Sequence, residues 1–209
     1  MIRVIIADDH AVVRRGIREI LADAPDMQLT GEAESGKHVL RLAETAPCDV
    51  AVLDIFLQDL NGLEVLKQLR ARHPHLRVLI LSAYPEEQYA VRAFKSGASG
   101  YLTKTSAPEE LIDAIRQAAR GGKYVTRALA EQLAQTLGGA PSAAHDALSD
   151  RELEVLRGIG VGKNLNEIAS ELALSPKTVS TYRTRILEKL GLDTTADLIR
   201  YALEQDLTK

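Results

Sequence analysis

Residues 1–16 read MIRVIIADDHAVVRRG, an apolar run that ends in two adjacent acids. The β-branched residues Val4, Ile5 and Ile6 predict a buried strand, since such side chains favour extended backbone. Asp8 and Asp9 follow directly, and two neighbouring carboxylates repel each other. The stretch therefore predicts a strand whose carboxyl end holds an acidic pair that needs a compensating partner.

The rest of the first half repeats this alternation of strand and helix. Four further β-rich runs are MQLTGEAES from Met27, VAVLD ending at Asp54, RVLILS ending at Ser82, and GYLT ending at Thr103. Segments with helical spacing separate them, as in GLEVLKQLRARHP, where leucines recur at positions 63, 66 and 69. Five strands alternating with helices predict the α/β class, with a doubly wound, five-stranded parallel sheet.

The pattern changes near residue 120. The amphipathic helix APEELIDAIRQAARGG is terminated by Gly121 and Gly122. A helix-like stretch, TRALAEQLAQTL (126–137), then leads into GGAPSAAHDA (138–147). The latter is rich in small residues and has little to bury, which is typical of a domain boundary.

We therefore expect a first domain at 1–120, a linker at 121–146 and a small all-α, four-helix domain at 147–209. The last part contains only short helical segments, namely SDRELEVLRGI, NLNEIASELA, SPKTVSTYRTRILEKLG and TADLIRYALEQ. Helix N-caps are expected at Ser149, Asn166, Ser175 and Thr195.

Composition limits the possible function classes. The chain has 209 residues and a formal net charge of −3, so a nucleic-acid partner would have to meet a local basic surface. No window approaches 18 uncharged apolar residues, and the chain starts with a strand rather than a signal segment. We expect a cytoplasmic protein without a membrane partner.

Polar residues end or follow four of the predicted strands, at Asp8, Asp9, Asp54, Ser82 and Lys104. The carboxyl ends of parallel strands meet at one rim, where such sheets bind ligands. Three carboxylates there need a cation, and their oxygens suit Mg²⁺, helped by the lysine. The alternative is that the acidic pair only caps the helix beginning near His10, which leaves the other strand ends unexplained. His10 is interpreted as a loop or helix-start residue rather than a catalytic one.

The motifs IIADDH, VLDIFLQDLNG, LILSAY and SGASGYLTK resemble, in order and separation, the flavodoxin-like receiver domain of two-component response regulators. The resemblance covers about residues 1 to 120. It implies that a sensor histidine kinase donates a phosphoryl group to Asp54, with Mg²⁺ as cofactor. The implied metal ligands are Asp9 directly, Asp8 through water, Asp54 itself and the backbone carbonyl of Phe56.

The same resemblance implies further roles at the other strand ends. Lys104 and Ser82 would hold the phosphoryl oxygens, and Tyr101 matches the switch aromatic that turns inward when Ser82 moves. Phosphoryl transfer needs such a positioned nucleophile, metal and cation. Thr105 stands where many receivers have proline, which counts against the cis peptide often found there, because non-proline cis bonds cost several kcal/mol.

The resemblance to receivers also implies that the residues two beyond the acceptor and two beyond the switch hydroxyl flank the path of a hydrolytic water, and both are aromatic here. Phe56 and Tyr84 lie two residues beyond the acceptor and the switch hydroxyl, respectively. They offer no carboxylate or amide to orient a water, so a long-lived phosphorylated form is expected. The alternative is that both rings pack on neighbouring loops and leave the phosphoryl group open.

The segment NLNEIASELALSPKTVSTYRTRILEKLG has the form of two helices joined by a short turn. Its second helix has an apolar stripe at Val179, Tyr182, Ile186 and Leu190, and basic residues at Lys177, Arg183, Arg185 and Lys189. Such a helix suits phosphates beside a major groove, although an ordinary solvated basic face gives the same pattern.

With LSDRELEVLRGIGVGKNLNEIA before it, this segment resembles the four-helix LuxR-type helix-turn-helix domain, over about residues 147 to 209. A receiver followed by this domain is similar to the NarL/FixJ class, and SPKTVSTY is most similar to its BvgA-like and EvgA-like members. Base edges would face Ser180, Thr181 and Thr184, while the DNA backbone would lie near Lys177, Tyr182 and Arg183. Ser180 and Thr184 stand where members of the class often have lysine, so a target rich in guanine contacts cannot be assumed.

These resemblances imply a phosphorylation-controlled regulator of transcription, not an enzyme, that binds double-stranded promoter DNA as a homodimer. The helix within 191–209 is the candidate dimer helix, with Leu198, Ile199 and Ala202 as its apolar face. One alternative is a phosphorylation-independent DNA-binding protein whose receiver is a dimerisation scaffold. Another is an aspartyl-phosphate phosphatase, which ordinarily needs a second acid where this chain has Phe56.

Overall fold

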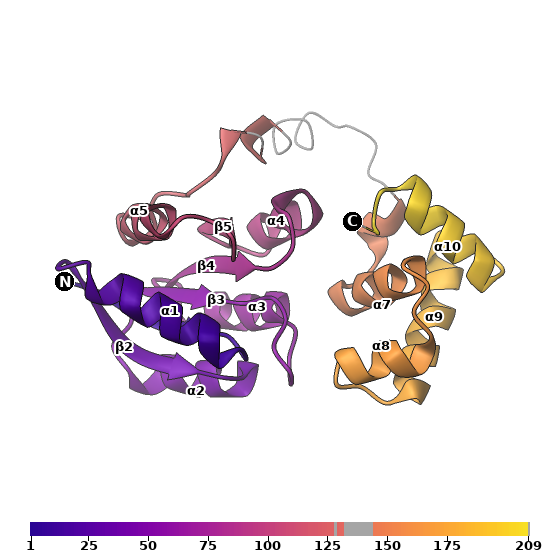
Figure 1. Cartoon of the computed structure of the whole chain (residues 1–209), viewed down its shortest axis with the longest axis horizontal. Helices are drawn as coiled ribbons and strands as arrows, with labels where there is room; N and C mark the ends of the chain where they lie inside the picture. The colour runs from indigo at the N-terminus through magenta and orange to yellow at the C-terminus, as the bar shows by residue number, and fades with distance from the viewer. Residues whose placement is uncertain (128, 132–143, 209) are drawn as a thin grey trace. The chain divides into compact units, whose positions relative to one another are not determined.

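The computed structural model describes residues 1–127, 129–131 and 144–208. Its internal contacts divide the chain into two compact units, Met1–Gln135 and Thr136–Lys209, and each is described by itself (Figure 1). None of the helices in these ranges is both long and apolar enough to cross a membrane.

The first unit is built on a five-stranded parallel sheet in the order β2-β1-β3-β4-β5. The strands are β1 (Ile2–Ala7), β2 (Met27–Ala33), β3 (Val50–Leu53), β4 (Arg77–Ser82) and β5 (Gly100–Thr103). The chain adds β2 on one side of β1 and then β3, β4 and β5 on the other side. The predicted doubly wound sheet is therefore confirmed. Asp54 lies one residue beyond its strand.

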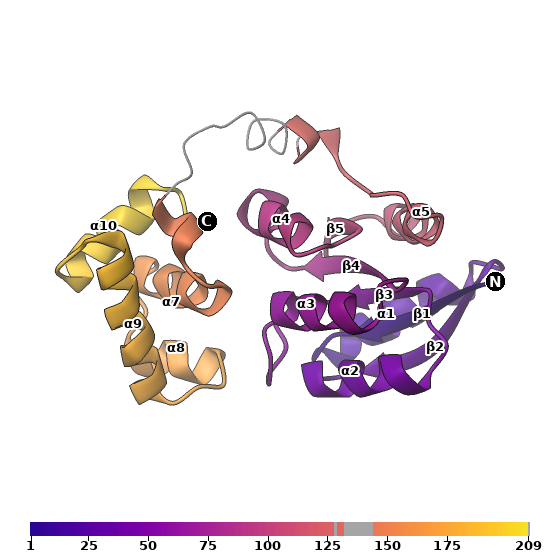
Figure 2. The same cartoon turned by 180° about the vertical axis from the view of Figure 1, so that it is seen from behind.

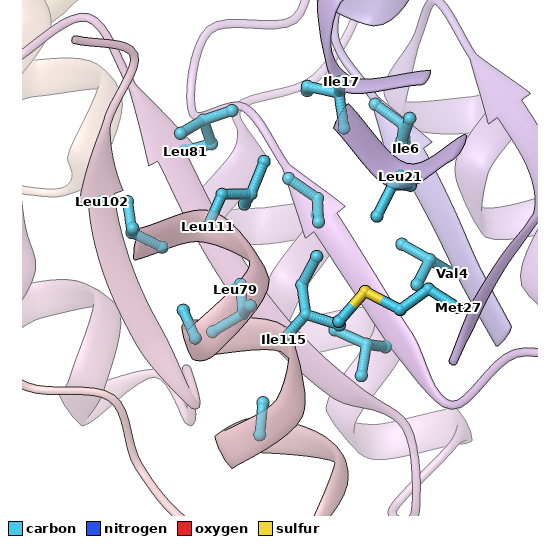
Figure 3. Packing of buried hydrophobic residues seen from close by; sticks show 14 of the residues in the cluster. Val4, Ile6, Ile17, Leu21, Met27, Leu79, Leu81, Leu102, Leu111 and Ile115 are labelled. Carbon is cyan, nitrogen blue, oxygen red and sulfur yellow. The ribbon is translucent and has the colours of Figure 1, made fainter. Parts of the chain in front are cut away.

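Helices cover both faces of the sheet (Figures 1 and 2). On one face lie α1 (Ala11–Ala22) and α5 (Pro108–Ala119), whose apolar residues pack on β1, β3 and β4. Figure 3 shows Ile17 and Leu21 of α1, Ile115 of α5, and Val4 and Ile6 of β1 in one buried cluster. The other face is covered by α2 (Gly36–Thr45), α3 (Gly62–Arg72) and α4 (Glu86–Lys95).

The alternation of side chains along β1 explains this two-sided burial. Val4 and Ile6 belong to the α1/α5 core, while Ile5 between them is equally buried. The leucines of α3 at 63, 66 and 69 are all fully buried, as their spacing predicts. Burial on both faces holds the strand ends in fixed positions.

The chain continues to pack on the first unit after α5. The Tyr124 N–H donates to the Ser99 carbonyl at 2.8 Å, and Tyr124 pairs in parallel with Gly100 of β5. Thr126 donates its hydroxyl to the Glu86 carboxylate. Residues beyond the expected boundary at 120 thus still contact the receiver-like unit. Most of the helix expected at 126–137 lies outside the described residues.

The second unit is helical, as predicted. Its elements are the 3₁₀ helix η1 (Ala144–Ala147), α7 (Asp150–Gly160), α8 (Leu165–Glu171), α9 (Pro176–Leu190) and α10 (Thr195–Glu204).

Two of the four expected N-caps are wrong. Ser149 and Ser175 cap α7 and α9 as predicted, but Asn164 caps α8 and Thr194 caps α10. In both corrected cases a carboxylate three residues after the cap accepts from the cap's own N–H and completes a capping box. That reciprocal pairing decides the helix start.

Candidate functional site

The carboxyl ends of the parallel strands bring the predicted acidic and basic groups together at one rim. Asp8 follows β1, Asp54 follows β3, Ser82 ends β4 and Lys104 follows β5. Lys104 Nζ lies 2.7 Å from Oδ2 of Asp8 and 2.7 Å from Oδ2 of Asp54. Both carboxylates are buried, so the ammonium group bridging them provides one of the compensating charges.

A possible metal-binding group lies at the same rim. Carboxylate oxygens of Asp8, Asp9 and Asp54 and a ring nitrogen of His10 lie within 4.8 Å of one another. His10 occupies the N-cap position of α1, where the sequence placed it, but its Nδ1 lies 2.7 Å from Asp9 Oδ1. It also lies 3.2 Å from Asp8 Oδ1. These contacts of His10 with Asp8 and Asp9 could not be predicted from the sequence, because no sequence pattern indicates the orientation of the His10 ring.

Burial and charge act in opposite directions on Asp54. Burial raises the pKa of its carboxyl, the attraction and hydrogen bond of Lys104 lower it, and the Asp8 carboxylate raises it, so that the net pKa is about 6. For Lys104, burial lowers the pKa, but the two carboxylates outweigh it and leave the pKa above its ordinary value. The lysine therefore stays charged, and Asp54 is ionised at neutral pH.

The loop after Asp54 is fixed by backbone contacts. The Phe56 N–H donates to Asp54 Oδ1 at 3.3 Å, and Phe56 pairs with Asn61 in an isolated antiparallel bridge. The backbone at Gly62 passes so close to Asp54 that a Cβ there would lie 2.1 Å from the Asp54 carbonyl oxygen. Only glycine fits this close approach, which brings the start of α3 against the Asp54 backbone.

The hydroxyl group of Ser82 and the ring of Tyr101 are linked through Tyr84. Ser82 Oγ accepts from the Tyr84 N–H at 3.2 Å, and the Tyr101 hydroxyl donates to the Tyr84 carbonyl at 2.9 Å. The Tyr101 side chain is buried. The expected switch aromatic thus lies in an inward position. No cis peptide bond occurs in the described residues, so the Lys104–Thr105 bond is trans.

Three aromatic rings pack against one another, and one of them belongs to Phe56, two residues after Asp54. The Phe56 and Tyr84 centroids are 4.8 Å apart, and the Tyr89 ring of α4 lies 5.7 Å from the first and 5.6 Å from the second. Tyr89 is fully buried and supports both rings. Tyr89 could not be identified from the sequence as part of this group, because its helical spacing indicates only a core residue.

Some of the predicted DNA-contact residues of α9 are exposed to solvent, and the others are half-buried. Lys177, Thr181 and Thr184 are exposed, whereas Ser180, Tyr182 and Arg183 are half-buried. Of the expected apolar stripe, Val179 and Ile186 are fully buried, while Tyr182 and Leu190 are half-buried. The two exposed threonines are bonded to their own helix, Thr181 Oγ1 to the Lys177 carbonyl at 3.0 Å and Thr184 Oγ1 to the Ser180 carbonyl at 3.2 Å.

Not all the basic residues of α9 form one free positive surface. Lys189 Nζ lies 2.6 Å from Oε2 of the buried Glu152 of α7, so this lysine forms an ion pair inside the domain. Arg183 reaches the Thr195 hydroxyl at the start of α10, at 3.4 Å. Arg185, one of the four basic residues expected to suit phosphates, is exposed.

The expected apolar dimer face of α10 is wrong in two of its three residues. Leu198 and Ala202 are fully buried within the domain, and the Ala202 methyl group lies against Gly160 of α7, where a Cβ would approach to 2.6 Å. They belong to the core of the helical unit. Ile199 is half-buried, and Leu203 is the exposed large apolar residue of this helix.

Known families match both units of the chain. The family described as response regulator receiver domain matches residues 4–116, more than half of the chain. The chain belongs to the response regulators. A second family, the bacterial regulatory proteins of the luxR family, matches residues 146–202 of this response regulator. Together they give it the domain composition of the NarL/FixJ class.

Similar proteins match this response regulator over almost its whole length. The response regulator GacA of Pseudomonas aeruginosa is 36% identical over 211 residues, covering 99% of this chain and 98% of that protein. UvrY of Escherichia coli K12 is 34% identical over 209 residues, covering 99% and 96%. The predicted family is confirmed.

Solved structures of related regulators share the fold. RcsB of Salmonella enterica serovar Typhimurium, bound to the promoter P1flhDC in the presence of phosphomimetic BeF₃⁻, is 26% identical with a TM-score of 0.65. The match covers 96% of this chain and 97% of that one. ChrA, a response regulator of a heme-sensing two-component system, is 33% identical with a TM-score of 0.54, covering 99% and 98%.

Proposed function

We propose that this response regulator accepts a phosphoryl group on Asp54 from a sensor histidine kinase and then controls transcription by binding promoter DNA as a homodimer. The observation that carries the proposal is the buried rim where Lys104 contacts both Asp8 and Asp54. Phosphoryl transfer depends mainly on positioning and charge neutralisation, and a carboxylate beside a fixed ammonium group provides both.

The proposed cofactor is Mg²⁺, and the oxygens at the rim fit it. Asp8 Oδ2 and Asp9 Oδ1 are buried oxygen atoms, and each lies 2.7 Å from a nitrogen, that of Lys104 and that of His10 respectively. Such carboxylate oxygens are ligands that a hard divalent cation prefers. Asp9 would bind directly and Asp8 through water, with Asp54 and the Phe56 carbonyl completing the protein ligands. When bound, the ion supplies charge neutralisation for the phosphoryl group.

The side chains of this chain supply the remaining steps. A carboxylate oxygen of Asp54 forms the new bond to phosphorus, the bond from phosphorus to the kinase's histidine nitrogen breaks, and that nitrogen keeps the electron pair. Lys104 and Ser82 hold the phosphoryl oxygens. Since the Tyr84 backbone contacts both the Ser82 hydroxyl and the Tyr101 hydroxyl, a movement of Ser82 would be transmitted to the Tyr101 ring.

The proposed DNA-binding element is α9, which is supported by the promoter-bound relative and by the exposed polar residues of this helix. The proposed base-reading residues are Ser180, Thr181 and Thr184, and those proposed to lie near the backbone are Lys177, Tyr182 and Arg183. We propose 1–120 as the receiver, 121–146 as the linker and 147–209 as the DNA-binding domain. A chromosomal promoter as partner implies a cytoplasmic location.

A phosphorylation assay tests the acceptor. A small-molecule phosphodonor with Mg²⁺ should label the wild type at one site, while Asp54→Asn should remove the label. Asp113→Asn, on the exposed side of α5, is the matched control and should be labelled like the wild type. Labelling that survives Asp54→Asn, or that proceeds equally in a chelator, would reject the assignment.

Two further measurements separate the alternatives. Binding to duplexes selected from a random pool should strengthen after phosphorylation in the wild type but not in Asp54→Asn. Equal affinity with and without the phosphodonor would favour the scaffold alternative. Multiple turnovers of phosphate-ester hydrolysis in a steady-state assay would favour the phosphatase.

A further inference from the structure

We propose that α9 recognises thymine in the major groove through the γ-methyl groups of Thr181 and Thr184. The inference rests on the DNA-binding function proposed above and adds the chemistry of the base contact. The hydroxyl groups of the two threonines donate to backbone carbonyls one turn earlier in the same helix. Their hydrogens are therefore not available to a base.

The remaining outward groups of these threonines are methyls and oxygen lone pairs. Both side chains are exposed and lie three residues apart, on the same face of the helix. The back-bonding also fixes χ1, because a hydroxyl bonded to the preceding turn holds the branched side chain in one orientation. Each methyl group is thus held at a defined position on the exposed surface.

The threonines form the middle of an exposed stripe, defined as Lys177, Thr181, Thr184 and Glu188, which recur at helical spacing. The stripe has a cation at its amino-terminal end, suited to a phosphate, and an anion at its carboxyl end, which a phosphate would repel. Between them the stripe offers no hydrogen-bond donor. Guanine presents two acceptors in the major groove and needs donors, whereas thymine presents a methyl group. The middle of the stripe therefore fits thymine.

The alternative is that both threonines release their helix carbonyls on binding and donate to a base. Two substitutions distinguish the cases, since Thr→Ser keeps the hydroxyl and removes the methyl, while Thr→Val keeps methyl groups and removes the hydroxyl. A methyl contact survives in the valine variant. A hydroxyl contact survives in the serine variant.

The experiment uses the full-length phosphorylated protein and a duplex that it selects from a random pool. Thymines of this duplex are replaced one at a time by deoxyuridine, which keeps the pairing and the O4 acceptor and lacks only the C5-methyl group. Removal of one buried methyl group corresponds to an equilibrium change of about fourfold. We expect about fourfold weaker binding at a thymine contacted by each threonine and unchanged binding at the others.

The variants complete the test. Thr181→Ser and Thr184→Ser should each lose the preference for thymine over uracil at one position, and the two valine variants should keep it. Equal binding of the wild type to the thymine and uracil duplexes at every position would overturn the methyl contact while leaving DNA binding intact. If the valine variants lost the preference for thymine over uracil and the serine variants kept it, the methyl contact would also be overturned. Failure to select any duplex would instead reject the proposed DNA-binding function.

Discussion

At the residue scale, Asp54 illustrates how a buried acid is kept available for chemistry. Burial raises its pKa to about 6, and Lys104 prevents a larger rise. The identity and order of the rim residues could be predicted from sequence, because each ends or follows an apolar strand. The position of Lys104 between Asp8 and Asp54 could not be predicted, since it depends on the three-dimensional course of the chain after β5.

The raised pKa of Asp54 predicts a pH-dependent effect of Asp54→Asn on stability. The folded state holds a proton that the unfolded state has released between about pH 4 and 6, so the wild type loses stability as pH rises through that window. In the presence of a chelator, the unfolding free energy of the variant minus that of the wild type should increase by up to about 3 kcal/mol from pH 4 to pH 7.5. Urea unfolding of both proteins at the two pH values measures this. A constant difference would contradict the raised pKa.

The aromatic group of Phe56, Tyr84 and Tyr89 predicts a long-lived phosphorylated state. The rings of these residues pack on one another, and neither Phe56 nor Tyr84 offers a carboxylate or an amide to orient an attacking water. Phe56→Asn combined with Tyr84→Glu should lose phosphate at least about tenfold faster than wild type after the donor is removed. Tyr84→Phe keeps the ring and should retain the slow rate. Phosphate loss from wild type as fast as from the double variant would refute the shielding.

At the element scale, helix existence followed from the sequence more reliably than helix ends and faces. Spacing located α9, but the start of α8 depends on a reciprocal contact between Asn164 and Glu167. The apolar residues of α10 were assigned to a dimer face although Leu198 and Ala202 fill the domain core. An apolar stripe on a helix does not indicate whether it packs against the same chain or against another chain, which explains this error.

The capping of α8 gives a direct comparison of two asparagines. Asn164 Oδ1 accepts from the N–H groups of Asn166 and Glu167, at 3.0 and 3.1 Å, whereas the Asn166 side chain is exposed. Asn164→Ala should therefore lower the unfolding free energy of the helical unit by about 1 kcal/mol, and Asn166→Ala should change it little. Denaturant unfolding followed by circular dichroism compares them. A larger effect at Asn166 would favour the sequence-based cap.

At the scale of the whole molecule, a chain of net charge −3 must bind DNA through local charge. The exposed Arg185 of α9 is well placed for a phosphate contact, alongside the proposed contact of Arg183. Arg185→Ala should weaken binding to all sequences and reduce the slope of log affinity against log salt by about 1. Arg15 is an exposed residue of α1, and Arg15→Ala changes the net charge equally and should leave the slope unchanged. Equal slopes for all three proteins would exclude a phosphate contact at Arg185.

The pairing of Tyr124 with Gly100 bears on aggregation. β5 lies at the end of the sheet and hydrogen-bonds only to β4 within it, so its outer edge would present unpaired backbone groups to other molecules. The chain after α5 covers part of that edge. A protein truncated after residue 120 should therefore self-associate at concentrations where one truncated after residue 131 stays monomeric, as sedimentation velocity would detect. Identical sedimentation of the two would mean that the edge is harmless. The segment that follows α5 thus hinders other molecules from adding a strand to this edge of the sheet.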